Sequence, residues 1–289
     1  MRHLRHLKEY KLWEQSRELT PEQEGFLNRY VRGTWGINSE GLVDVEGDFN
    51  CPGSGIKSLM GIRFGTVSGN FNCSSNQLTS LEGAPREVKG NFYCHNSQLT
   101  SLEGAPREVR GDFDCHKNQL TSLEGAPREV RGNFDCYRNQ LTSLEGAPLK
   151  VGWNFSCPYN QLTSLEGAPE KVWGDFRCTD NQLTSLKGAP RDVGGDFYCL
   201  YNQLTSLEGA PRDVGGNYYF SENPVSVETL NKIISFIIDN PNMKYGAILA
   251  SLQSRIPEKD WKKLDKSSLD KMSQTQKKVY GMLGGIGGI

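Results

Sequence analysis

The chain has 289 residues, 36% of them hydrophobic, and its acidic and basic side chains nearly cancel, leaving a formal charge of −1. A nearly neutral chain lacks the basic surface that nucleic acids require, so we expect no nucleic-acid partner. The sequence has no apolar run of the roughly 18 residues that span a bilayer, and its charged first residues, 1–8, lack the apolar segment of a signal peptide. These features predict a cytoplasmic protein without a membrane partner.

Residues 1–44 are expected to form a helical cap followed by a β-hairpin. Residues 4–19 have the pattern of a charged amphipathic helix. A second helix is predicted to begin at Thr20, where Pro21 suits the first turn and Gln23 can close a capping box. Residues 35–45 then have the pattern of a strand, a turn and a strand. Such a segment would cover the end of the repeats that follow, because an uncapped solenoid exposes its core.

A repeat of about 21 residues occupies residues 45–223. It is marked by eight cysteines, of which the first two are 22 residues apart and the later ones 21. A fixed period in the twenties is typical of a solenoid, in which each coil stacks on the previous one. The cysteines are Cys51, Cys73, Cys94, Cys115, Cys136, Cys157, Cys178 and Cys199.

Each repeat contains a segment in which apolar and polar residues alternate, as in residues 109–116, and this is the pattern of a strand with one buried face. All the cysteines occupy the same position of the repeat, and Phe220 takes that position after Cys199. We therefore expect reduced thiols that pack as small hydrophobes. The nine strand-like segments begin at Val45, Val67, Val88, Val109, Val130, Val151, Val172, Val193 and Val214.

Two rows of polar residues recur within the repeat and are predicted to bond the backbone of neighbouring coils. One row lies three residues after the cysteines and has Ser97 as its exception: Asn76, Asn118, Asn139, Asn160, Asn181 and Asn202. The other row precedes the repeated phenylalanine: Asp48, Asn70, Asn91, Asp112, Asn133, Asn154, Asp175, Asp196 and Asn217.

The pattern Phe-x-Cys-x-x-Asn-x-Leu-x-x-Leu resembles the leucine-rich repeat, in the short variety of about 21 residues found in bacteria and bacteriophages. Phe113, Cys115, Asn118 and Leu120 match its core positions. The resemblance implies an α/β repeat solenoid with a parallel β-sheet on the concave face, helical caps at both ends, and a protein partner. Four residues separate the repeated valine from the phenylalanine where the family has three, which predicts a longer strand. A plain parallel β-solenoid is therefore the alternative fold.

Residues 224–289 are expected to form a C-terminal helical cap domain with a flexible glycine-rich tail. Leu230, Ile233, Ile234 and Ile237 have helical spacing within residues 225–239. Further helices are predicted at residues 244–253, 258–264 and 268–282, before the tail at 284–289.

Neither catalysis nor a cofactor is expected. The sequence has no phosphate-binding loop, zinc-protease motif or recognisable set of nucleophile and base. Some bacterial leucine-rich-repeat effectors carry a ubiquitin-ligase domain with a catalytic cysteine, but residues 223–289 contain no cysteine. His95 and His116, with Asp114 and Asp135, could hold a divalent metal. Exposed strand side chains lack the supporting shell of a true site, so we expect no metal.

Variation among the coils is concentrated at three positions, which are the residue after the phenylalanine and the first and second residues after the cysteine. Tyrosine and arginine are enriched there, as they are at protein interfaces. We therefore predict that the concave face binds a partner protein. The chain would then be a bacterial or phage protein that modulates a host or defence protein in the host cytoplasm. The alternatives are a structural or assembly component and a secreted, host-directed effector. The predicted binding residues are Tyr93, His95, Asp114, His116, Lys117, Asp135, Tyr137, Arg138, Tyr159, Arg177, Tyr198, Tyr201 and Tyr219.

Overall fold

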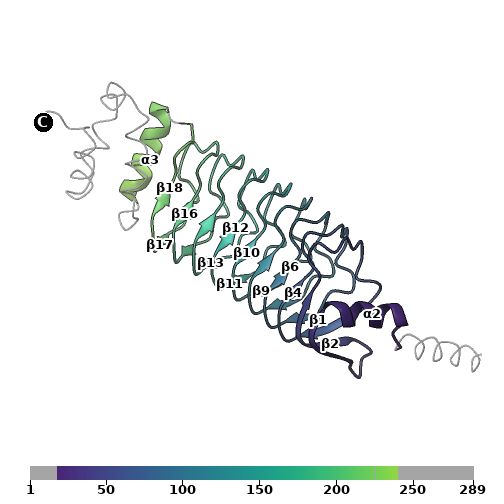
Figure 1. Ribbon diagram of the computed structural model, residues 1–289. Helices are drawn as coiled ribbons and strands as arrows, with labels where there is room; N and C mark the ends of the chain where they lie inside the picture. The colour runs from purple at the N-terminus through teal and green to yellow at the C-terminus, as the bar shows by residue number, and fades with distance from the viewer. Residues whose placement is uncertain (1–17, 225, 240–289) are drawn as a thin grey trace, which may run out of the picture.

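A computed structural model describes residues 18–224 and 226–239, which form an elongated stack of coils with a helix at each end (Figure 1). The helices are α2, Pro21–Tyr30, and α3, Val227–Asp239. The helix expected at residues 4–19, the helices expected after residue 243 and the glycine-rich tail lie outside the described residues. The helices among the described residues are all too short or too polar to cross a membrane.

The N-terminal end is closed by α2 and a hairpin. The predicted capping box is confirmed, because the Gln23 N–H donates to Thr20 Oγ1 at 3.2 Å and the Thr20 N–H donates to Gln23 Oε1 at 2.9 Å. Strands β1, Val31–Ile37, and β2, Val43–Asn50, pair in antiparallel fashion, so the hairpin is longer than expected. The ring of Phe26 on α2 lies 5.7 Å from that of Phe49, and this contact covers the first coil.

Parallel strands run along one side of the stack, and each pairs in register with the equivalent strand of the next coil, valine beside valine and phenylalanine beside phenylalanine. The first strands after the hairpin are β3, Phe64–Val67, and β4, Phe71–Asn72. The others are β5 Glu87–Val88, β6 Phe92–Tyr93, β7 Glu108–Val109, β8 Phe113–Asp114, β9 Glu129–Val130, β10 Phe134–Asp135, β11 Lys150–Val151, β12 Phe155–Ser156, β13 Lys171–Val172, β14 Phe176–Arg177, β15 Asp192–Val193, β16 Phe197–Tyr198, β17 Asp213–Val214 and β18 Tyr218–Tyr219.

The longer strand predicted for each coil forms only in the first, as β2, and in the later coils the strand-like segment is broken into two short strands. Gly90 lies at such a break, between β5 and β6, and stacks on the previous coil. A Cβ atom at Gly90 would lie 2.7 Å from the carbonyl oxygen of Gly69, so this coil packs too closely on the previous one for a side chain at Gly90. The fold is nevertheless the expected one, a solenoid of leucine-rich coils with a parallel sheet along one face. The described coils contain only turns and bends outside the strands.

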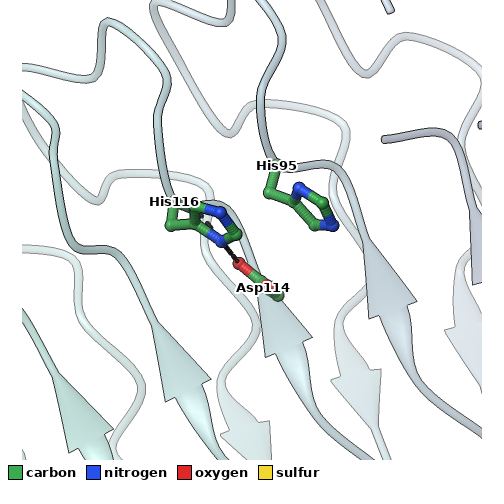
Figure 2. A group of neighbouring side chains, drawn as sticks. All are labelled: His95, Asp114 and His116. Carbon is green, nitrogen blue, oxygen red and sulfur yellow. Dashed lines mark hydrogen bonds and ion pairs between the residues drawn. The ribbon is translucent and has the colours of Figure 1, made fainter. Parts of the chain in front are cut away.

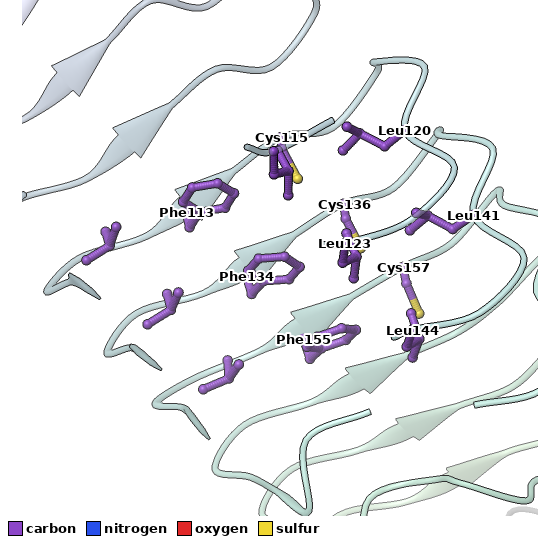
Figure 3. Close-up of a cluster of buried hydrophobic side chains, with 14 of the residues drawn as sticks. Phe113, Cys115, Leu120, Leu123, Phe134, Cys136, Leu141, Leu144, Phe155 and Cys157 are labelled. Carbon is purple, nitrogen blue, oxygen red and sulfur yellow. The ribbon is translucent and has the colours of Figure 1, made fainter. Parts of the chain in front are cut away.

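The core consists of rows of identical side chains, one from each coil (Figure 3). Successive phenylalanine rings from Phe71 to Phe197 stack with centroids 5.2–5.5 Å apart. The row ends at Tyr218, whose ring is tilted by 40° against Phe197. Burying each such side chain stabilises the fold by about 1.5–3 kcal/mol.

The eight cysteines are free and buried, which confirms their predicted packing role. Most thiols also donate to the backbone of the next coil, as from Cys115 Sγ to the Asp135 carbonyl at 3.4 Å. Burial raises the pKa of Cys115 well above its ordinary value. Phe220 occupies the cysteine position in the last coil and is likewise buried.

Both polar rows bond the backbone as predicted. In the asparagine row, Asn118 Nδ2 donates to the carbonyls of Cys115 and Cys94 at 2.9 and 3.1 Å, and its Oδ1 accepts the Leu99 N–H at 3.1 Å. In the second row, Asp112 Oδ1 accepts the Asn133 N–H at 2.7 Å. Each coil is thus tied to its neighbours by side chains as well as by strand pairing.

Helix α3 follows the last coil. Ser226 Oγ accepts the Thr229 N–H at 3.1 Å, which satisfies one of the free donors at the start of the helix. Ile233, Ile234 and Ile237 are buried in the same core as the coils. The side chain of Leu230, predicted on the same face, lies outside the described part.

Candidate functional site

All thirteen predicted binding residues lie in three parallel rows, the first on the short strands and the other two just after them, and all are at least partly exposed. We call the surface made by these rows the strand face. Strand register brings the first row together, since Asp114 pairs with Tyr93 on one side and Asp135 on the other. Arg177 likewise pairs with Tyr198.

Aromatic rings stack along the strand face in two groups. His116 lies between His95 and Tyr137, with ring centroids 4.4 and 4.3 Å away and planes inclined by 9° in both cases. Farther along, Tyr198 stacks on Tyr219 at 4.6 Å. Stacking at the spacing of the coils holds these rings in place before any partner arrives, which limits the entropy lost on binding.

Cations also lie over aromatic rings on this face. The Arg138 guanidinium lies 5.3 Å from the centroid of Tyr159, and that of Arg177 lies 5.4 Å from Tyr198. The Tyr198 hydroxyl donates to Asp196 at 2.9 Å, and burial together with this carboxylate raises the pKa of Tyr198 to about 12. The hydroxyl therefore remains a hydrogen-bond donor at neutral pH.

A small acidic hollow opens between the two aromatic groups. It has a volume of about 230 Å³, and Tyr93, Asp114, Asp135 and Arg177 contribute to its wall. Burial raises the pKa of Asp135 to about 6, although the Tyr137 N–H donates to its carboxylate. The hollow thus combines carboxylates, a tyrosine and an arginine, as in a surface that accepts polar side chains.

The third row has an unusual backbone, which the sequence did not reveal. Its residues adopt left-handed conformations, with φ of 51° at Lys117, 54° at Arg138, 54° at Tyr159 and 51° at Tyr201. The left-handed region costs residues with a Cβ atom roughly 1–2 kcal/mol each, and asparagine and aspartate tolerate it best after glycine. Some other coils have better-suited residues here, namely Ser75, Asn96 and Asp180, and these were the signal that could have predicted the conformation.

Three potential metal ligands meet where the first two rows adjoin. One ligand atom from each of His95, Asp114 and His116 lies within 4.8 Å of the other two. His116 Nδ1 is 2.5 Å from Asp114 Oδ1, and Figure 2 shows this contact beside the ring of His95. Asp135, the fourth residue considered from the sequence, is not in the group.

Two exposed tryptophans are not among the binding residues predicted from the sequence. Trp153 and Trp173 are 64% and 66% exposed, and the Lys171 ammonium lies 4.2 Å from the centroid of Trp173. They follow the repeated valine, at positions where other coils have glycine, lysine or arginine. That substitution of a large apolar residue was the available signal.

The fold and the exposed rows define a repeat protein of the solenoid class. No protein-family model and no curated protein matches the chain. Among solved structures it is similar to YopM from Yersinia enterocolitica WA-314, with 18% identity and a TM-score of 0.35. The match covers 62% of this chain and 47% of YopM, so it spans about half of that protein. At this level of similarity nothing about function follows, and the fold is defined by the strand pairings described above.

Proposed function

We propose that this chain is a non-catalytic interaction module whose strand face binds a partner protein. The observation that carries the proposal is the left-handed row, in which Tyr159 and Tyr201 are 51% and 54% exposed. A tyrosine in this conformation adds strain and exposes apolar area, whereas Asn96 and Asp180 at the same position in other coils tolerate the left-handed backbone better and expose less apolar area. Strained residues of this kind cluster at functional sites, where the surrounding structure holds them in place.

The chemistry of the face supports a protein partner more than the other classes of ligand. Stacked tyrosines offer large, ordered contact areas, and Asp114, Asp135 and Arg177 supply charges of both signs. Nucleic acid would be repelled by the carboxylates of the hollow. The small volume of the hollow also argues against an enclosed small-molecule site, since such sites have about 300–1,000 Å³.

A role of a bacterial or phage protein in modulating a host or defence protein is the finer form of this proposal. Its support is the resemblance of the repeat to short leucine-rich repeats of bacteria and phages, and a fold alone does not fix function. A structural or assembly component and a secreted effector are the alternatives. A structural spacer would tolerate replacement of the exposed tyrosines, whereas a binding module would not.

The test is affinity capture with three baits from the lysate of a candidate host, with quantitative mass spectrometry. One bait is the unchanged chain, and the second carries Arg138→Asn, Tyr159→Asn and Tyr201→Asn, which suit the left-handed backbone. The third, a matched control, carries Trp153→Gly and Trp173→Gly, which restore the glycine found at these positions in other coils. Circular dichroism and thermal unfolding first establish that the three baits fold alike.

A protein captured in stoichiometric amount by the first and third baits, and at least tenfold less by the second, supports the proposal. Direct titration of that purified protein must then reproduce the difference in affinity. A protein lost only with the tryptophan variant would move the binding site away from the strand face. Equal capture by all three baits would favour the structural role.

A further inference from the structure

We propose that His95, Asp114 and His116 bind one divalent zinc ion on the strand face. The three residues come from two adjacent coils, and the in-register pairing of β6 with β8 brings them together. This inference does not depend on the proposed partner protein, since metal binding is measured with the isolated chain.

The donor set has the chemistry that zinc prefers. Zinc is commonly bound by imidazole nitrogens and carboxylate oxygens, and three protein ligands with a water in the fourth position form a recurrent arrangement. In the metal-bound state the ligand atoms lie about 2.0–2.2 Å from the ion, so the present separations of up to 4.8 Å must shorten. The proposal requires the side chains to rotate, while the strand register keeps the two coils side by side.

One observation points to a missing ligand at this place. The Nδ1 atom of His95 is buried and has no hydrogen-bond partner among the described residues. A buried polar nitrogen left without a partner costs about 1–3 kcal/mol, so native structures rarely retain one. A bound ion that His95 turns to ligate removes this cost.

Backbone and aromatic neighbours pack around the group. The backbone N–H of His116 donates to Asp114 Oδ1 at 3.1 Å, and this bond holds the carboxylate beside the imidazole. The ring of Tyr137 covers the other face of His116, and Tyr93 lies edge-on to His95 at 6.3 Å. These contacts limit the orientations open to the two imidazoles and to the carboxylate.

The stacking of the two imidazoles sets a condition on the site. Two parallel rings 4.4 Å apart cannot both direct a lone pair at one ion, so one ring must turn on binding. The torsion of histidine about its Cβ–Cγ bond is broad, which makes this rotation inexpensive. His95 is the ring that turns and leaves its stack on His116, because His116 is also held by Asp114 and Tyr137.

Competing ligands elsewhere in the chain can be removed or discounted. The sequence has four histidines, and the other two are His3 and His6. The eight thiols are buried in the core, so zinc reaches them only if the coils open. The test therefore uses the full chain with His3→Gln and His6→Gln, stripped of metal by chelation.

Zinc is titrated into this protein by calorimetry, and Co²⁺ is used as a spectroscopic probe. We expect one Zn²⁺ per chain and the visible absorption of tetrahedral Co²⁺. His95→Gln, His116→Gln and Asp114→Asn should each weaken zinc binding by at least about tenfold. Asp135→Asn is the matched control, because it removes a nearby carboxylate that is not a ligand, and it should change the affinity by less than about threefold.

Absence of a binding heat, or equal weakening by Asp135→Asn and Asp114→Asn, would overturn the proposal. So would unchanged affinity in the two histidine variants. Should a variant fail to fold, X-ray absorption of the zinc-bound parent gives an independent answer. Two imidazoles and no sulfur in the coordination sphere support the site, and any other ligand set refutes it.

Discussion

The asparagine row carries a measurable share of the stability, and Asn139→Ala tests this directly. Asn139 Nδ2 donates to the carbonyls of Cys115 and Cys136 at 3.2 and 3.0 Å, and its Oδ1 accepts the Leu120 N–H at 3.1 Å. After the substitution each carbonyl keeps one donor, from Asn118 and Asn160 respectively. The Leu120 N–H, however, loses its acceptor in a buried position.

At about 1 kcal/mol for each hydrogen bond, the loss of three bonds should lower the free energy of unfolding by roughly 3 kcal/mol. Stacked repeats open locally, so hydrogen exchange at the Leu120 amide is the sharpest assay, alongside urea unfolding. A change of this size corresponds to about a hundredfold loss of protection. Asn139→Asp should be at least as damaging, because a carboxylate can accept from Leu120 but cannot donate to the two carbonyls.

Gln140→Ala is the matched control, since this adjacent side chain is exposed and should change stability by less than about 0.5 kcal/mol. If Asn139→Ala were as harmless as Gln140→Ala, the row would be a consequence of the stacking and not a cause of it. Protection lost throughout the chain instead of near Leu120 would likewise contradict the local account.

Three further predictions concern other rows. Tyr159→Asn should leave the melting temperature unchanged or raise it while weakening partner binding, because asparagine tolerates the left-handed backbone; a lower melting temperature would contradict the strain argument. Burial raises the pKa of all eight thiols. A thiol reagent at pH 8 should therefore label no cysteine in the folded chain and all eight after unfolding. Rapid labelling of the folded chain would disprove their burial. Gly146→Ala should lower the free energy of unfolding by about 1–3 kcal/mol, measured by urea unfolding. The reason is that Gly146 has a φ of 84° and a Cβ atom there would lie 2.4 Å from the Glu124 nitrogen. An unchanged unfolding midpoint would show that the turn relaxes.

The fold was predictable because a repeated residue is observed many times in one sequence. A single cysteine or asparagine has several explanations, but a residue that recurs every 21 positions must serve something that every coil has. Stacking then assigns the roles, since Cys115 and Asn118 can each meet only their own equivalents and the adjacent backbone. The same reasoning located the variable rows, the first of which occupies the outward position of the short strands.

What the sequence did not predict depends on the backbone and not on the pattern of residue types. The glycine in each strand segment predicts a longer strand, but the contact of Gly90 with the carbonyl of Gly69 arises only once two coils are stacked. The left-handed conformation at Tyr159 was hidden because large side chains rarely adopt it. The exposed tryptophans lie in the break between the two short strands of their coils, where the pattern that assigns inward and outward positions no longer holds.

The left-handed row can accommodate backbone strain because hydrogen bonds hold the backbone at and next to each of its residues. The residue after Lys117 is Asn118, whose side chain makes three hydrogen bonds. The backbone N–H of Lys117 donates to the Tyr137 carbonyl at 3.0 Å. The backbone conformation is therefore imposed by the coils and does not depend on the side chain at that position. Side chains in this row can be substituted at a small and local cost in stability, whereas substitutions in the inward rows disrupt the core. A solenoid built this way separates folding from recognition within a single turn of the chain, and this separation is why the binding variants proposed above should retain the fold.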